Sequence, residues 1–265
     1  MRSFFVLFLT TACLVAAPAW KAELTSTKPG LHPSISPSNL DFSLSWKGMV
    51  KAGTLRIEFA PAGVNKPGSF VTKSSASSQG AAAVLFPYKH SYWSEIHPTT
   101  LAAKFFTATE DDAKESVVTT NRYDSGSVAA KEVTTNLMGG AVATKAYKFP
   151  FDSANDLFSA ILFIRSQKLD VGEEYTLLLL PFKSPYLLKV RVDAKEKHLG
   201  QDTIRMSFAM RKIDRNTHQL TPYKKLKKPV TLWLSDDVDR VILELRAAVY
   251  IGDVRAVLTG FTKHL

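Results

Sequence analysis

Three aspartates, Asp236, Asp237 and Asp239, form the densest group of carboxylates in the sequence. Calcium sites are built from such oxygen-rich groups. Their spacing, however, does not match the twelve-residue calcium-binding loop, and no glycine stands at their centre. Aspartate and serine side chains also accept hydrogen bonds from backbone N–H groups in turns. We therefore predict that Ser235 and these aspartates stabilise a turn, and a metal site is the alternative.

The residues of hydrolases and zinc enzymes do not occur in their usual patterns. Six histidines, at positions 32, 90, 97, 198, 218 and 264, show neither a helical pair nor zinc-ligand spacing. The sequence contains no Gly-x-Ser-x-Gly motif and no glycine-rich loop for phosphate. A glycosidase could use two carboxylates that face each other, such as Glu58 and Glu244, but the sequence does not show whether these two residues lie opposite each other. We predict a protein that is not an enzyme and has no cofactor. An envelope hydrolase that uses Asp237 or Glu244 is kept as an alternative, behind the two non-catalytic functions given at the end of this section.

A second group of candidate residues is apolar and would bind rather than react. Met206, Phe208 and Met210 alternate along one predicted strand, and methionine adapts its shape to irregular apolar guests. Together with a predicted helix, these residues could line an interior that accepts an acyl chain. The candidate lining consists of Leu157, Phe158, Ile161, Met206, Phe208, Met210 and Trp233. The alternative is an ordinary packed core.

Positive charge is concentrated in one region of a chain whose formal net charge is +10. Between positions 183 and 228, thirteen lysines and arginines stand against four acidic residues. Such a patch attracts anionic lipid headgroups, polyanions or acidic partners, and an ordinary solvated face is the alternative. The predicted basic surface comprises Lys189, Arg191, Lys195, Arg205, Arg211, Lys224, Lys225, Lys227 and Lys228.

The C-terminal residues 229–260 carry the clearest structural pattern. Between Val241 and Val249, apolar side chains fall on alternate positions, which is the period of a strand with one buried face. We predict strands at 230–234, 241–251 and 254–260. The last two would be joined at Gly252 and Asp253, because glycine adopts the positive φ of a tight hairpin. The chain is thus predicted to end in an antiparallel meander.

One segment, residues 152–167, departs from this rhythm and shows the spacing of an amphipathic helix. Asp152 or Ser153 is expected to cap its start, with Asp156 as the acid of a capping box. Further strands are predicted at 41–46, 54–59, 101–107, 116–123, 129–135, 141–149, 175–180, 188–195 and 204–211. Residues 61–80 are expected to form a loop, and residues 84–93 a strand or a short helix. The predicted fold is mainly β, a curved antiparallel sheet or open β-barrel packed around one main α-helix.

Residues 1–19 have the features of a signal peptide. Arg2 is followed by an apolar run and by small residues up to Ala19, where we expect cleavage. The single cysteine, Cys13, would be removed with it; lipidation at Cys13 is the alternative. Residues 20–39, with three prolines among serine, threonine and lysine, are expected to be a flexible leader before a single domain at 40–265. The predicted location is the periplasm or the exterior, and a mature chain without thiols suits an oxidising compartment.

Several of these segments occur together in one order: the hairpin at 44–53, His97-Pro98, the helix at 156–165, the Gly172 turn, the segment 231–237 and the hairpin at Gly252. This arrangement resembles domain-of-unknown-function family 3108, a group of exported bacterial proteins. The helix and the segment 233–237 are its most specific parts, whereas residues 61–80 look expanded and residues 125–140 fit loosely. The resemblance implies one largely antiparallel β domain wrapped around its helix, and it brings no catalytic residues.

These observations lead to one hypothesis and its alternatives. We expect a non-catalytic exported protein that binds or carries an apolar or lipid-like ligand, guided by its basic face to anionic membranes or polyanions. The alternative is a structural or adaptor protein that binds another envelope component through that face. Nucleic acid is not an expected partner, because the predicted export signal places the protein away from it.

Overall fold

The computed structural model describes residues 18–26, 28–33, 36–61, 68–249 and 252–264. The predicted signal peptide lies outside the described residues except for its last two positions, and so does Cys13. Within the described part, no helix has the length and the apolar character needed to cross a membrane.

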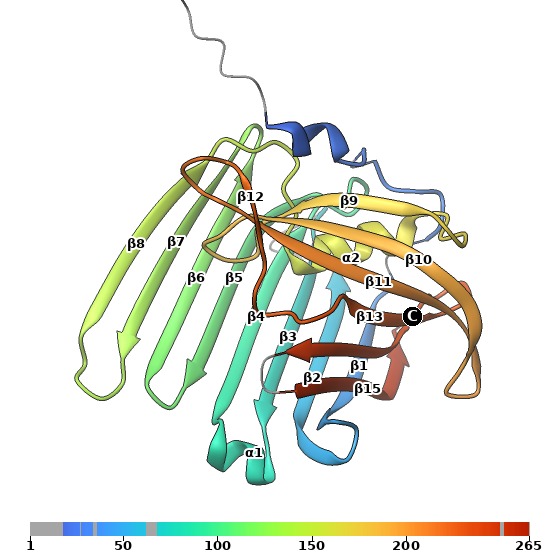
Figure 1. Ribbon diagram of the computed structural model, residues 1–265, viewed down its shortest axis with the longest axis horizontal. Coiled ribbons are helices and arrows are strands. Elements are labelled where there is room, and N and C mark those ends of the chain that lie inside the picture. Colours follow the sequence, from blue (N-terminus) through green and yellow to red (C-terminus); the bar gives the residue numbers. More distant parts are fainter. Residues whose placement is uncertain (1–17, 27, 34–35, 62–67, 250–251, 265) are drawn as a thin grey trace, which may run out of the picture.

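The described strands form one large antiparallel sheet that is curved but not closed (Figure 1). Neighbouring strands follow the order β8-β7-β6-β5-β4-β3-β2-β1-β15-β14-β13-β11-β10-β9, and β12 pairs with β11. The strands are β1 (Ser38–Trp46), β2 (Val50–Pro61), β3 (Phe70–Ser78), β4 (Tyr88–Ile96), β5 (Ala103–Asp112), β6 (Glu115–Asp124), β7 (Ser127–Asn136), β8 (Val142–Phe149), β9 (Glu174–Leu179), β10 (Tyr186–His198), β11 (Gln201–Ile213), β12 (Leu220–Pro222), β13 (Val230–Ser235), β14 (Ile242–Val249) and β15 (Gly252–Lys263). The final strand pairs with the first, so two meanders meet in one sheet.

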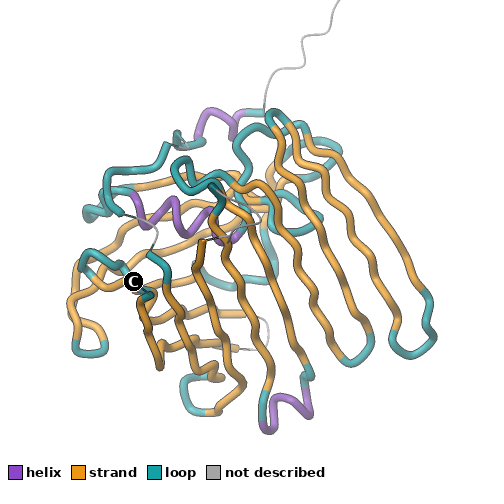
Figure 2. Tube along the Cα trace, turned by 180° about the vertical axis from the view of Figure 1, so that it is seen from behind, coloured by secondary structure: helices purple, strands orange, loops and turns teal. Residues whose placement is uncertain are grey.

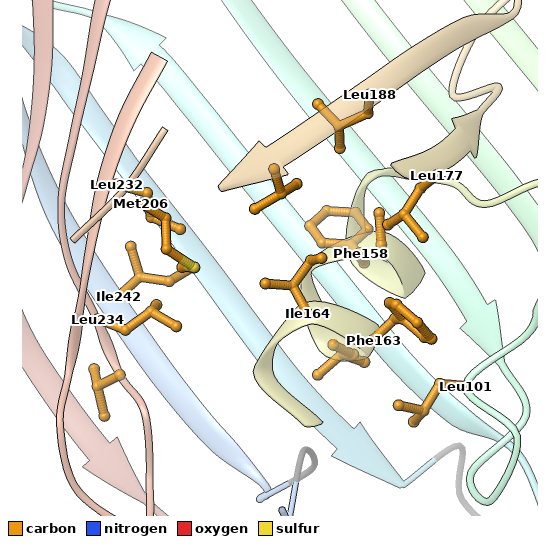
Figure 3. Packing of buried hydrophobic residues seen from close by; sticks show 14 of the residues in the cluster. Leu101, Phe158, Phe163, Ile164, Leu177, Leu188, Met206, Leu232, Leu234 and Ile242 are labelled. Atoms are coloured by element: carbon orange, nitrogen blue, oxygen red, sulfur yellow. The ribbon is translucent and has the colours of Figure 1, made fainter. Parts of the chain in front are cut away.

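The main helix α2 (Leu157–Ser166) lies inside the curve of the sheet and fills one part of it (Figures 1 and 2). Phe163 and Ile164 of the helix belong to one buried cluster with Leu177, Met206 and Leu234 from the strands (Figure 3). Burial of these apolar side chains is the main favourable contribution to the fold. The predicted mainly β fold around one main helix is confirmed.

The helix begins later than the sequence pattern predicted. Asp156 is its N-cap, accepting hydrogen bonds from the backbone N–H groups of Phe158 and Ser159, while the Ser159 hydroxyl accepts from the Asp156 N–H. The predicted caps at positions 152 and 153 are therefore wrong. The physical reason is that Asn155 forms a bridge with Leu179 of β9, which holds the preceding residues out of the helix.

The two ends of the sheet overlap, and a second apolar cluster fills the overlap. Leu178 and Leu187, on the outward face of β9 and β10, pack with Val128 and Phe149 from the inward face of β7 and β8. Where β9 ends, the Leu180 carbonyl accepts hydrogen bonds from Asn121 and Tyr123 of β6. The sheet is thus rolled past itself, which buries its end strand without closing a barrel.

Residues 18–26 and 28–33 do not form the flexible leader that their composition predicted. They begin with the 3-10 helix η1 (Ala19–Glu23), in which Trp20 is 3% exposed and donates a hydrogen bond to the His218 carbonyl. Thr25 then exchanges two hydrogen bonds with Thr176 of β9. We call residues 18–26 and 28–33 the N-terminal strap, because they run along β9 and the end of α2.

Two other local predictions are corrected. The predicted loop at 61–80 contains the strand β3, which pairs with β2 on one side and β4 on the other although its sequence is rich in serine. The helix α1 (Gly80–Leu85) then leads into β4, so residues 84–93 contain the end of a helix and most of a strand. In the last hairpin, Gly252 pairs with Val249 and Asp253 with Ala248, so both residues belong to β15 and do not form the predicted turn.

Candidate functional site

Beyond α2, the inward face of the sheet carries apolar side chains that are only partly buried. They pack against the main core, and the strand register places them on the same face as its fully buried members. Leu44, for example, lies opposite Ala256, which lies opposite Leu245 and then Leu232. We call the following residues the inner apolar surface: Leu44, Leu55, Ile57, Phe208, Met210, Leu245 and Leu258.

Of the seven predicted lining residues, only Phe208 and Met210 belong to this surface. Met206 is 0% exposed and Phe158 is 5% exposed, so both are core residues. Leu157 and Ile161 of α2 are partly buried and pack against the same cluster. These six residues come together around the interior, as the spacing suggested. The structure places the seventh, Trp233, elsewhere.

Trp233 lies on the outward face, because its neighbours Leu232 and Leu234 occupy the inward positions of β13. Its ring stacks on His198 at a centroid distance of 4.3 Å, and the Arg246 guanidinium lies 4.8 Å from its centroid. Its inclusion in the interior is therefore wrong. Strict alternation in the Leu-Trp-Leu sequence was the signal that could have shown this.

Glu244, proposed above as a hydrolase residue, holds this outward group together. It is 2% exposed and accepts hydrogen bonds from His198, at 2.7 Å, and from Arg246. Burial raises the pKa of Glu244, but the hydrogen bonds from Arg246 and His198 outweigh it and leave the pKa below its usual value. A carboxylate used in this way acts as a structural counter-charge.

A second polar group faces the interior and was not found from the sequence. Glu110 of β5 accepts hydrogen bonds through Oε1 from the hydroxyl groups of Tyr88, at 2.7 Å, and Tyr92, at 2.8 Å. Tyr88 and Tyr92 are four positions apart on β4, so both point to the inward face. Burial raises the pKa of Tyr92 and of Tyr88, which keeps both phenols protonated as donors at neutral pH.

His90 lies between the two tyrosines on the same face. Its ring stacks on Tyr92 at 4.0 Å, and its Nε2 lies 3.1 Å from the Ser74 hydroxyl of β3. Burial lowers the pKa of His90, which favours the neutral ring. We call Ser74, Tyr88, His90, Tyr92 and Glu110 the glutamate–tyrosine cluster. The alternation of Tyr88, His90 and Tyr92 was a usable signal, whereas the approach of Glu110 depends on the pairing of β4 with β5.

The cluster and the inner apolar surface are connected by the register of the sheet. Glu110 pairs with His90, His90 with Ala76, and Ala76 with Leu55. Three strand spacings separate Glu110 from Leu55, or about 14 Å at the usual distance between neighbouring strands. One face of the sheet therefore offers a polar group and an apolar surface within the length of one amphipathic molecule.

The acidic turn has the structural role that its sequence predicted. Asp237 Oδ1 accepts hydrogen bonds from the Ser235 hydroxyl and from the backbone N–H groups of Asp239 and Arg240, at 2.8–3.0 Å. Among the described residues, no group of three or more potential metal ligands comes together. Arg240, which follows the turn, donates hydrogen bonds to the carbonyl groups of Arg165, Gln167 and Lys168 at the end of α2.

The predicted basic residues divide into two groups. Four of them form ion pairs: Lys189 with Glu23, Arg191 with Asp193, Lys195 with Asp236 and Arg205 with Glu196, at 2.8–3.8 Å. The other five are exposed, and no ion pair of theirs is found in the described part of the chain: Arg211, Lys224, Lys225, Lys227 and Lys228. Unpaired positive charge is therefore gathered around β12 and the loop that follows it.

Comparison with known proteins adds the family to these observations. Residues 41–259 match the model of the family described as protein of unknown function DUF3108. The chain belongs to the DUF3108 family. The resemblance noted in the sequence is thereby confirmed, and the match runs from β1 to β15.

One solved structure shares the fold of this DUF3108 chain, and its description is β-barrel-like. A beta-barrel-like protein of domain-of-unknown-function family DUF1849 from Brucella abortus has a TM-score of 0.50 at 10% identity, covering 86% of this chain and 98% of that one. A candidate exported protein with a YmcC-like fold from Bacteroides fragilis has a TM-score of 0.35 at 7% identity, covering 89% and 100%. No curated protein matches the sequence. At this identity, the DUF1849 likeness concerns the fold alone.

Proposed function

We propose that this DUF3108 protein is a non-catalytic, exported envelope protein that binds or carries a lipid-like ligand on its inner apolar surface. The observation that carries the proposal is that seven inward-facing apolar side chains remain partly exposed beside a densely buried core. When an acyl chain covers apolar surface that was in contact with water, the free energy of the system falls. Phe208 and Met210 add polarizable side chains that adapt to such a guest.

The arrangement of strands favours an elongated ligand. The inner apolar surface draws its residues from β1, β2, β11, β14 and β15, which are neighbours in the sheet apart from the intervening β13. The helix α2 occupies the adjoining part of the interior, so a ligand would lie against the sheet beside it (Figures 1 and 3). An extended acyl chain could then cross several strands along the directly paired residues that run from Leu44 to Leu232.

Binding of a fluorescent fatty acid to the purified chain tests this proposal. We expect saturable binding, and we expect Leu245→Asn to weaken it at least tenfold, because the amide would need water where the chain packs. Leu137→Asn is the matched control, since Leu137 is 53% exposed in the β7–β8 connection. A wild-type protein that takes up no fatty acid, and carries no lipid when isolated from cells, would contradict the proposal.

The unpaired cations favour a second function, which is docking to an anionic surface. Lysines at 224, 225, 227 and 228 extend from one loop without ion-pair partners among the described residues, and such groups attract anionic lipids and acidic partners. In the carrier proposal this loop guides the protein to a membrane. In an adaptor protein it would be the binding site itself, for another component of the envelope. If the protein binds its envelope partner equally well after substitution of the inner apolar surface, and if salt abolishes this binding, the result would favour the adaptor.

A further inference from the structure

Glu110 is an inward-facing carboxylate whose charge the protein does not neutralise. Its Oε1 atom accepts hydrogen bonds from the hydroxyl groups of Tyr88 and Tyr92, and the further hydrogen bond found for these phenols joins them to each other and not to a cation. In the described part of the chain, no lysine, arginine or histidine forms an ion pair with Glu110, and Oε2 receives no hydrogen bond. A carboxylate surrounded by phenol groups and not by cations is unexpected in a chain with a net charge of +10.

The side chains around Glu110 are those that recognise an ammonium group. Tyr88 is 39% exposed and Tyr92 is 9% exposed, so one tyrosine remains accessible while the other is held in the wall of the sheet. His90 stacks on Tyr92 and stands beside Tyr88, at centroid distances of 4.0 and 5.9 Å. The negative faces of such rings attract cations, and a carboxylate with one unoccupied oxygen adds a charged hydrogen-bond acceptor.

The cluster is also rigid enough to act as a preformed site. Each hydroxyl that holds Glu110 comes from β4, and Tyr92 packs against Phe106 and Phe182, at 5.8 Å in both cases. Ser74 fixes the ring of His90 from the other side. A site whose groups are held before binding loses little conformational entropy on binding.

We propose that the glutamate–tyrosine cluster binds the ammonium group of an amphipathic ligand whose apolar part lies on the inner apolar surface. This inference rests on the proposed function and specifies its ligand class, a lipid with a primary amine in its headgroup. The separation of about 14 Å between Glu110 and Leu55 suits such a molecule, since headgroup and chain would follow one register row of the sheet. The same chemistry could come from a free amine, so the source is decided by experiment.

Three lipids with identical acyl chains test the inference by titration in detergent micelles. They are phosphatidylethanolamine, its N-acetylated form, which has no charge on nitrogen, and phosphatidylglycerol. We expect the wild-type chain to bind phosphatidylethanolamine about tenfold more tightly than the N-acetylated form, a difference within the range of a partly desolvated cation–aromatic site. Glu110→Gln should remove this preference and leave the affinity for the N-acetylated lipid unchanged.

Glu115→Gln is the matched control, because Glu115 lies on the adjacent strand β6, is exposed, and accepts no hydrogen bond on its carboxylate from any described residue. It should keep the preference. Equal affinity for all three lipids, unaffected by Glu110→Gln, would overturn the headgroup inference and leave the proposed function intact. If no lipid binds, the proposed function fails, and a chemical-shift titration with ethanolamine decides the cluster by itself. A shift at His90 in the wild type, lost in Glu110→Gln, would assign the site to free amines, and no shift would overturn it.

Discussion

At the scale of single residues, two buried arginines connect α2 to the acidic turn. Arg165 of the helix donates to the Asp239 carbonyl, and Arg240 donates back to carbonyls at the end of the helix. Burial lowers the pKa of Arg165 to about 10, but the group stays charged at neutral pH. Cations are stabilised at a helix C-terminus by the unsatisfied carbonyl groups. This contact joins the end of the helix to the turn that follows the segment 233–237.

Replacing Arg240 tests this connection. We expect Arg240→Ala to lower the free energy of unfolding by about 3 kcal/mol, because several carbonyl groups near the helix end would lose a charged donor. Arg240→Lys should recover little, since one ammonium cannot span the three carbonyl groups that the guanidinium contacts. Urea unfolding measures both changes. Lys168→Ala is the control, because the Lys168 side chain is exposed, and a loss of equal size there would contradict the assignment.

The buried cap Asp156 predicts a dependence of stability on pH. Burial raises the pKa of Asp156, although hydrogen bonds from Ser94 and from two backbone N–H groups oppose this. An acid with a raised pKa in the folded state stabilises the fold most when it is protonated. Its contribution is therefore complete below the unfolded pKa of about 4 and decreases as the pH rises through the folded pKa.

Asp156→Asn, which caps a helix but does not titrate, isolates this effect. The difference in unfolding free energy between wild type and variant should move in favour of the variant as the pH rises from 4 to 8. Thermal or urea unfolding at a series of pH values measures it. A difference that stays constant over this range would show that the carboxyl group has the same pKa in both states.

At the scale of elements, the N-terminal strap covers a strand edge that would otherwise be open. Thr25 bonds to both backbone groups of Thr176, and Gly30 and His32 donate to the hydroxyl and carbonyl groups of Ser166 at the end of α2. A methyl group on Gly30 would lie 2.1 Å from the Ser166 carbonyl oxygen, so only glycine permits this approach. Covered edges are protected from pairing with other chains.

Trp20 anchors the strap, and its loss should release it. We expect Trp20→Ala to cost about 3–5 kcal/mol, because its ring is buried against Phe151 and its indole N–H is hydrogen-bonded. Hydrogen exchange should then become faster at Thr176, whose amide is protected by the strap. Trp20→Phe keeps most of the apolar contact and should retain much of the protection. Unchanged exchange at Thr176 in the alanine variant would contradict an anchoring role.

Sequence patterns predicted those elements whose side chains alternate cleanly. The strands around Val190 and Leu243 and the helix around Phe163 were found because one face of each is apolar. The strand β3 was missed because its serines carry no alternation, and its pairing with β2 and β4 defines it instead. The strap was missed because its order depends on Trp20 and Thr25 meeting distant partners.

The candidate site was less predictable than the fold for the same reason. Phe208 and Met210 could be assigned to the interior from their own strand. Glu110 could not, because its meeting with Tyr88 and Tyr92 requires the register of β4 against β5. Trp233 was misplaced because an aromatic residue between two leucines looks apolar, while its indole N–H and ring serve Glu196, His198 and Arg246 on the outside.

At the scale of the whole molecule, the rolled sheet separates two kinds of surface. Its inward face is mainly apolar and carries the glutamate–tyrosine cluster, and the cations of β10 and β11 lie outward. Near β13, Lys195 pairs with Asp236 and Arg205 with Glu196, whereas the lysines of the loop after β12 form no ion pair with any residue that the structure describes. Unpaired positive charge is therefore concentrated in one loop, and we propose that this loop orients the protein at an anionic surface.

This charge distribution predicts binding to anionic vesicles that depends on the loop and on salt. Changing Lys224, Lys225, Lys227 and Lys228 to glutamine should weaken co-sedimentation with phosphatidylglycerol vesicles on the order of a thousandfold at low salt, since each lysine near such a surface contributes about 1 kcal/mol. The matched control changes Lys189, Arg191, Lys195 and Arg205 to glutamine. It removes the same formal charge from residues already engaged in ion pairs.

Because screening shortens the reach of exposed charges, binding of the wild type should also fall steeply toward 0.5 M salt. Equal losses in both variants would mean that net charge alone, not its placement in the loop, brings the protein to the membrane.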